Sequence, residues 1–235
     1  MAQTAARLGL AVIQGITIHN PKNLNEPLTQ AEIRAGVEIS EFVDAFVFGH
    51  LRSRDVDMIG LQRELARIRR ETGKPVTSNF LLTDYADTRG RRLLRLADFV
   101  ITDLPRPYQH NPAQGDPQVA AAAVAQAIDE LRQFDLPAIV SLVGYPSQGG
   151  PGFTEADQKV FVEQVLNTDT PRGVGIAFVS GFDLPWKQKL SETTPYTMEC
   201  DANLGFFRTR LSPDQSTADF SPKPALEIFR RRDGQ

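Results

Sequence analysis

The chain has 235 residues, of which 41% are hydrophobic, and a formal net charge of −3. This length suits one large domain, and α/β barrels routinely use it as a single unit. The nearly balanced charge gives no sign of a nucleic-acid partner. The short basic run Arg230–Arg232 is typical of a solvated tail. No stretch approaches the ~18 apolar residues of a membrane span. The single cysteine, Cys200, excludes an internal disulfide.

Short apolar runs alternate with amphipathic segments along the chain, a pattern typical of βα units around a parallel sheet. The runs are rich in Val, Ile and Phe and contain few charges, as expected for strands covered on both faces. The predicted strands are Leu10–Ile18, Phe42–Phe48, Pro75–Phe80, Asp98–Leu104, Ala138–Gly144 and Val174–Phe182.

Helices are predicted around and between these strands from capping residues, helical spacing and alanine content. Met1–Leu8 fits a helix end, and Asp55 and Asp57 fit the approach to a helix, where acids complement the helix dipole. Five more helices are predicted. One begins with a capping box at Thr29–Glu32, and the next carries Ile59, Leu61, Leu65 and Ile68 at helical spacing. The remaining three span Pro117–Phe134, run from a cap at Thr154–Asp157 to about Leu166, and span Pro222–Arg230.

These patterns make six βα units with no long linker, so we expect one (β/α)-barrel domain over residues 1–235. A closed barrel of the TIM type has eight parallel strands. Six strands leave sheet edges at Leu10–Ile18 and Val174–Phe182, which we expect a second copy or a partner chain to cover.

Several short motifs occur in order at the ends of the predicted strands. They are Gly9–Val12 with Gly15 and Ile16, Val47–Leu51, Lys74–Thr77, Ala97–Val100 with Arg106–Tyr108, Gly144–Ser147, Phe182–Lys187, Leu204–Phe207 and Ser221–Pro224. Together they resemble the bacterial branch of glycoside hydrolase family 17, which contains β-1,3-glucanases and glucan transglycosylases. The resemblance implies a TIM-type α/β barrel. It assigns the six runs to family strands three to eight, so we expect an N-terminally truncated barrel.

The resemblance also assigns the two catalytic positions of the family. Retaining cleavage of a glycosidic bond uses two carboxyl groups about 5–5.5 Å apart, one as nucleophile and one as acid/base. The acid/base position corresponds to Leu51 and the nucleophile position to Leu142. A hydrocarbon side chain can neither donate a proton nor attack an anomeric carbon, so we expect impaired catalysis.

Two acids at predicted strand ends are the alternative candidates for catalysis. Asp103 and Asp183 would face a bound sugar if the carboxylates had been relocated, and a raised pKa would mark such a role. The structural alternative is that Asp183 binds loop backbone or Lys187 and that Asp103 caps a turn before Pro105.

Further positions are predicted to bind substrate. His50 replaces a family asparagine that holds substrate hydroxyls, and flat aromatic rings suit the face of a pyranose. The predicted substrate-binding residues are His50, Tyr108, Tyr145, Asp183, Trp186 and Lys187. His19 and His110 have no acid or cysteine at metal-ligand spacing, so neither a metal site nor another cofactor is expected.

Three functions follow from these observations. The first is a family 17-like barrel with impaired catalysis that binds β-glucan or another oligosaccharide. The second is an active β-1,3-glucan hydrolase or transglycosylase that uses Asp103 and Asp183. The third is a non-catalytic interaction module that pairs through its open barrel edges.

Overall fold

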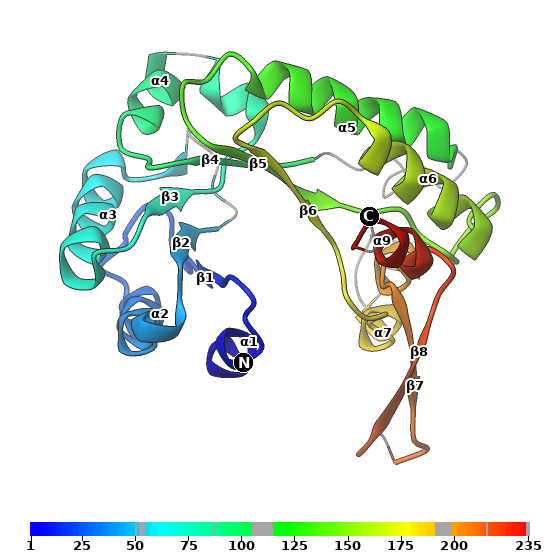
Figure 1. The fold of residues 1–235 in the computed structure, drawn as a ribbon. Helices are drawn as coiled ribbons and strands as arrows, with labels where there is room; N and C mark the ends of the chain where they lie inside the picture. Colours follow the sequence, from blue (N-terminus) through cyan, green and yellow to red (C-terminus); the bar gives the residue numbers. More distant parts are fainter. Residues whose placement is uncertain are drawn as a thin grey trace. The chain divides into compact units, whose positions relative to one another are not determined.

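The computed structural model describes residues 1–49, 51, 55–86, 88–104, 115–190, 199–214 and 216–233. The chain divides into two compact units, which are described separately below. Unit 1 comprises Met1–Asp103 with Phe134–Ile139, and unit 2 comprises Leu104–Gln133 with Val140–Gln235. Strands and helices alternate along the chain as far as β6, which is the predicted α/β architecture (Figure 1). No helix within the described ranges is long and apolar enough to cross a membrane.

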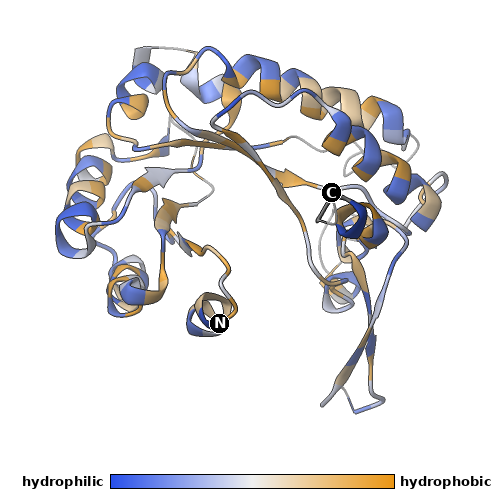
Figure 2. Ribbon diagram, viewed as in Figure 1, coloured by the Kyte–Doolittle hydropathy of each residue, from blue (hydrophilic) through white to orange (hydrophobic). Residues whose placement is uncertain are grey.

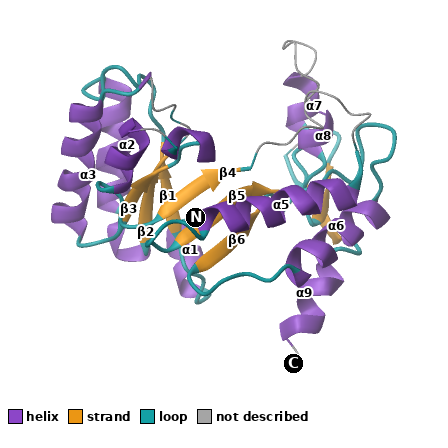
Figure 3. Cartoon of the chain, turned by 90° about the horizontal axis from the view of Figure 1, so that it is seen from above, coloured by secondary structure: helices purple, strands orange, loops and turns teal. Residues whose placement is uncertain are grey.

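Unit 1 contains a parallel sheet with helices on one side. Strands β1, β2 and β3 pair in that order, with Gly15 opposite Val47 and Val47 opposite Thr77. Helices α2 and α3 lie on the same side of this sheet (Figure 3). The elements are α1 (Ala2–Arg7), β1 (Ile13–Ile16), α2 (Pro27–Glu38), η1 (Ser40–Phe42), β2 (Ala45–Phe48), α3 (Met58–Thr72), β3 (Val76–Ser78), η3 (Leu82–Tyr85), α4 (Thr88–Leu94) and β4 (Val100–Asp103).

Strand β2, at the centre of its sheet, is covered on both faces, as expected for a parallel strand. Phe46 and Phe48 are fully buried on one face of β2, and Val47 on the other face packs with Phe99 and Ile101. Gly36 allows α2 to approach the sheet closely, because a Cβ there would lie 2.6 Å from the Cδ1 atom of Ile16.

Unit 2 contains most of strand β5, strand β6, two long helices and a C-terminal hairpin. Helices α5 and α6 lie side by side (Figure 3). Strand β6 lies next to β5 in its sheet, and just beyond β6 Val179 N donates to Val143 O over 2.8 Å. The elements are α5 (Pro117–Leu131), β5 (Ala138–Val143), α6 (Glu155–Asn167), β6 (Val174–Phe178), α7 (Trp186–Leu190), α8 (Glu199–Ala202), β7 (Phe207–Leu211), β8 (Ala218–Pro222) and α9 (Leu226–Asp233).

All six predicted strands are confirmed, each within its predicted bounds. Strands β2, β5 and β6 are mostly hydrophobic in Figure 2, which is the pattern that predicted them. The helix cap at Thr154 is also confirmed, since its Oγ1 atom accepts from Asp157 N over 3.1 Å. Asp57 caps α3 by accepting from Ile59 N over 3.1 Å.

Two predicted helix starts are wrong. Helix α2 begins earlier than the capping box, because the Glu26 carboxylate accepts from the backbone N–H groups of Leu28 and Thr29 and caps it there. Thr29 instead lies inside the helix, and its hydroxyl accepts from His19 N. The last helix begins at Leu226, because Pro222 ends strand β8 of an antiparallel hairpin that the sequence patterns did not predict.

Candidate functional site

The positions assigned to the two family glutamates carry leucines in different surroundings. Leu51 follows β2, is 3% exposed, and donates its backbone N–H to Asn79 O over 3.1 Å. Leu142 lies in β5, half-buried, with a φ of 55°. A positive φ is unusual for a bulky residue and costs about 1–2 kcal/mol. The backbone at Leu142 is therefore strained, and its side chain carries no carboxyl group.

Asp103, at the end of β4, is held by a neighbouring strand end within unit 1. The Nδ2 atom of Asn79 donates to its Oδ1 atom over 2.7 Å, and the Asn79 side chain is buried. The carboxylate thus stabilises the end of the sheet by accepting a bond from the residue that follows β3.

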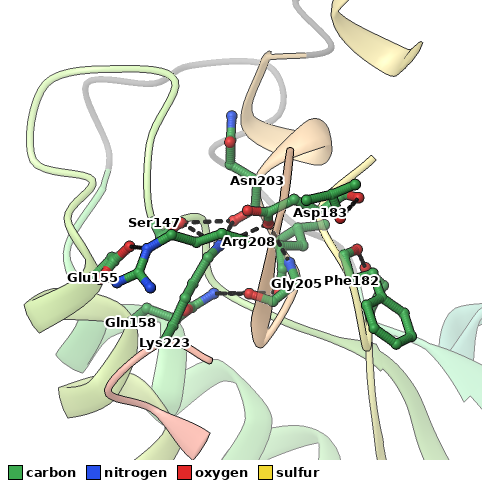
Figure 4. Close-up of polar contacts among 12 residues, drawn as sticks. Ser147, Glu155, Gln158, Phe182, Asp183, Asn203, Gly205, Arg208 and Lys223 are labelled. Atoms are coloured by element: carbon green, nitrogen blue, oxygen red, sulfur yellow. Dashed lines mark hydrogen bonds and ion pairs between the residues drawn. The ribbon is translucent and has the colours of Figure 1, made fainter. Parts of the chain in front are cut away.

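Asp183 follows β6 and is bonded to groups far along the chain. Its Oδ1 atom accepts from Lys223 Nζ over 2.7 Å and from Gly205 N over 3.0 Å (Figure 4). Lys187, the partner considered from sequence, does not make this bond. Its Nζ atom lies 5.9 Å from the ring centroid of Trp186, as in a cation–π contact.

Lys223 is the centre of a buried polar cluster. Its side chain is 1% exposed, and its ammonium group donates to Asp183, to Ser147 Oγ over 2.6 Å and to Asn203 O over 3.5 Å. Ser147 in turn donates to Asn203 O over 3.1 Å. An ammonium group has three N–H donors, so all of them have acceptors in this cluster.

Burial dominates the electrostatics of the ion pair. It raises the pKa of Asp183 above its ordinary value of 3.8, although the hydrogen bond and charge of Lys223 act in the opposite direction. Burial likewise lowers the pKa of Lys223 below 10.5 against the effect of Asp183. Both shifts reflect the cost of holding charges away from water.

Gln158 and two glycines hold the loops of this cluster together. The buried Nε2 atom of Gln158 donates to Tyr145 O over 2.9 Å and approaches Leu204 O and Gly205 O at 3.2 and 3.3 Å. A Cβ at Gly205 would lie 2.1 Å from Asp183 N, and one at Gly144 would lie 2.6 Å from Val179 O. These glycines are required because backbone approaches them closely.

A polar cavity of about 280 Å³ lies beside the cluster within unit 2. Its walls include Ser147, Gln148, Glu155, Asp183, Arg208 and Lys223. Arg208, on β7, is paired with Glu155 through two parallel bonds, with Nε 2.6 Å from Oε1 and Nη2 2.5 Å from Oε2. Its Nη1 atom also donates to Pro222 O over 2.7 Å. Two ion pairs therefore line one cavity.

The predicted aromatic positions differ in exposure. The Tyr145 ring is 1% exposed, stacks on Phe161 with centroids 5.5 Å apart, and contacts Phe153 edge-on at 5.4 Å. Core side chains therefore cover it, and burial raises its pKa well above the ordinary range. Trp186 is 55% exposed at the start of α7. His50 and Tyr108 lie outside the described residues.

No group of three or more His, Cys, Asp and Glu side chains in the described part of the chain is arranged to hold a metal ion. Sequence reasoning singled out Asp183 but gave no role to Lys223, Ser147 or Arg208. A signal for two of them was present, since Ser147 and Lys223 lie in motifs that carried the resemblance.

No protein-family model and no curated protein matches the sequence. Xylanase 10B from Thermotoga petrophila, solved with xylobiose, is similar with a TM-score of 0.59 and 10% identity, over 98% of this chain and 76% of that one. The family 113 β-mannanase AaManA from Alicyclobacillus acidocaldarius has a TM-score of 0.54 and 14% identity, over 100% of this chain and 76% of the mannanase.

Saccharomyces cerevisiae Gas2p, solved with laminaritetraose and laminaripentaose, is similar with a TM-score of 0.53 and 9% identity over 100% of this chain. The chain spans 51% of Gas2p, about half its length. At such identities the similarity shows the fold alone. The chain has a partial (β/α)-barrel fold of the kind found in glycoside hydrolases, as predicted.

Proposed function

We propose that this chain is a barrel related to the β-1,3-glucan-active enzymes of glycoside hydrolase family 17, and that it binds β-glucan-type saccharides without cleaving them. The observation that carries the proposal is the presence of Leu51 and Leu142 at the positions that the resemblance assigns to the two catalytic carboxyl groups. General acid–base catalysis alone contributes about 10²–10⁴-fold to such reactions, so losing both carboxyl groups removes most of the acceleration.

The bonding of the two alternative acids supports this proposal. Asp183 is bonded to Lys223 and Gly205, and Asp103 accepts a bond from Asn79. Each of these two acids therefore has a structural role, because its hydrogen bonds hold a strand end or a loop in place. The raised pKa of Asp183 follows from burial in this cluster.

The proposed binding is supported by the barrel fold and by an exposed aromatic side chain. Trp186 is 55% exposed, and its ring offers apolar area with a polar N–H edge, as pyranose stacking requires. Gas2p, which shares the fold, has been solved with laminari-oligosaccharides.

The test is to incubate the purified protein with laminaripentaose, measuring binding by calorimetry and products by chromatography. We expect measurable binding and no cleavage at ordinary enzyme rates. Turnover at such rates would refute the proposal. In that case Asp183→Asn distinguishes the rival enzyme, since loss of turnover with the fold retained would assign catalysis to relocated carboxylates.

A second candidate is an interaction module that pairs through a sheet edge. Strand β1 is an edge of its three-stranded sheet, and apolar residues at and before it are exposed, with Ile13 at 45% and Leu10 at 59%. Exposed strand edges favour pairing with another chain. Light scattering after gel filtration tests this candidate, and a strictly monomeric, stable chain would argue against it.

A further inference from the structure

The size and polarity of the cavity beside Lys223 limit the class of ligand that it can bind. Its volume of about 280 Å³ lies just below the ~300–1,000 Å³ of typical small-molecule sites, so it admits about one sugar ring and not an oligosaccharide. Charged or polar side chains from the β5–α6 loop, α6, the segment after β6 and the hairpin line it (Figure 4).

The charges on the walls cancel in pairs. Glu155 is paired with Arg208, and Asp183 with Lys223. Arg208 and Lys223 are the cations that the described residues place on the walls, and both are engaged: Lys223 donates to three acceptors, and Arg208 is bonded to both oxygens of Glu155. The pairing therefore favours a neutral ligand.

The groups that remain for a ligand are mainly acceptors. The Asp183 carboxylate accepts its hydrogen bonds from Gly205 and Lys223 at Oδ1, and within the described ranges its Oδ2 atom has no hydrogen-bond partner. Gln148 is exposed on the cavity wall and adds an amide, which both donates and accepts. A hydroxyl donating to a carboxylate makes a charge-assisted bond, roughly twice as strong as a neutral one.

A small neutral ring rich in hydroxyl donors fits these walls best. We infer that this cavity is a subsite for one sugar unit, with Asp183 Oδ2 accepting from a sugar hydroxyl and Gln148 bonding a second. The inference rests on the proposed saccharide binding and adds the place and the number of units bound.

Trp186, the first residue of α7, lies on a different surface from the cavity wall. Pro185 and Gln188 line the cavity, whereas Trp186 precedes Gln188 by two positions, and residues two apart on a helix do not face each other. The side chain of Trp186 is therefore not part of the cavity wall. The two surfaces can be separated by substitution.

The test uses methyl β-glucopyranoside and laminaripentaose as probes, with binding followed by NMR titration. Asp183→Asn keeps the shape of the side chain and removes its charge, and we expect about a tenfold or greater loss of affinity for the monosaccharide. Because that variant also weakens the bond to Lys223, Gln148→Ala serves as a second variant at an exposed position, with an expected loss of a few-fold. Gln118→Ala, an exposed amide on α5, is the matched control and leaves affinity unchanged.

The outcomes separate this inference from the proposed function. Loss of monosaccharide binding in both cavity variants, but not in the control Gln118→Ala, supports the subsite. If the unaltered protein binds laminaripentaose and neither cavity variant weakens either probe, the subsite is wrong and saccharide binding stands. If the unaltered protein binds neither probe, both are wrong.

Discussion

Two sets of residues that the family resemblance singles out differ in chemistry: one is apolar and the other is polar. Leu51 and Leu142 put hydrocarbon side chains at the positions that the resemblance assigns to the two family acids. The cluster around Lys223 is polar and buried, and the Lys223 ammonium group donates to three acceptors. Its members Ser147, Asp183 and Gly205 come from three of the motifs that carried the resemblance, and Lys223 from a fourth.

The difference teaches that the motifs can be explained by their part in the structure, separately from any catalytic role. Residues such as Gly205 and Lys223 close loops against one another, so they preserve the shape of the fold. Leu51 and Leu142 take no part in that closure, since neither belongs to the cluster. A chain can therefore keep the family pattern for structural reasons while its reacting positions change.

The largest expected effect comes from breaking the buried pair. Lys223→Met leaves Asp183 without its cation at a site where its side chain is 11% exposed, and we expect destabilisation by about 3–5 kcal/mol in urea unfolding. Lys159→Met is the control, because Lys159 pairs with Glu227 where both side chains are 31–54% exposed and such pairs contribute about 0–1 kcal/mol. Equal losses in the two variants would show that the cluster is not a stabilising centre.

A double variant tests whether the loss comes from the unpaired charge. Adding Asp183→Asn to Lys223→Met removes that charge, so we expect part of the stability to return. If the double variant is less stable than Lys223→Met by the full cost of Asp183→Asn alone, the two side chains act independently.

The second prediction concerns Leu142, the apolar position with a strained backbone. Because Leu142 has a φ of 55°, Leu142→Gly relieves strain that Leu142→Ala retains, and we expect the glycine variant to be the more stable of the two by about 1 kcal/mol. At Ile139, half-buried on the same strand with an ordinary backbone, the order reverses, since glycine in a strand costs about 0.5–1 kcal/mol. Chemical denaturation of the four variants measures both orders, and the same order at both positions would contradict the strain.

The fold was largely predictable because its signals are local. Each apolar run of the βα pattern is long and uncharged enough to mark a buried strand, and all six are strands. The hairpin of Phe207–Leu211 and Ala218–Pro222 escaped because its strands alternate arginine, aspartate and serine with apolar residues. Such short, exposed strands lack the continuous apolar run that marked the others.

The site was predictable only in part because its bonds are long-range. Asp183 could be selected from its place at a strand end, but its partner Lys223 lies 40 positions away, and Ser147 lies 76 positions from Lys223. A single sequence gives no spacing rule for contacts at such separations. The predicted start of α2 was wrong for a different reason, since Glu26 caps the helix in competition with the nearby capping box at Thr29.

The third prediction compares the buried pair with the exposed pair on the same cavity. Arg208 and Glu155 are 45% and 31% exposed, so water and salt screen their attraction. We expect Arg208→Ala to cost about 0–1 kcal/mol, and the cost to shrink as salt is added. A loss as large as that of Lys223→Met, or one insensitive to salt, would mean that the bond from Arg208 to Pro222 O carries most of the stability.

The smallest effect distinguishes a buried from an exposed carboxylate by pH. Asp214 accepts from the hydroxyls of Ser212 and Ser216, which lowers its pKa from 3.8 to about 2, whereas burial raises that of Asp183. Asp214 therefore contributes stability above pH 3.8 that is lost as the pH falls toward 2. The contribution of Asp183 has the opposite sign, because its charged form is disfavoured in the fold, and it decreases as the pH rises above 3.8.

Carboxyl NMR titration measures both groups in one experiment. We expect Ser216→Ala to move the pKa of Asp214 back toward 3.8 and to leave that of Asp183 unchanged. If Asp183 titrates below 3.8, the attraction of Lys223 outweighs burial, and the cluster is then a net stabilising ion pair rather than a costly one that packing holds in place. Either value decides how firmly Asp183 is charged at neutral pH, and hence how strong an acceptor its Oδ2 atom offers to a hydroxyl in the cavity.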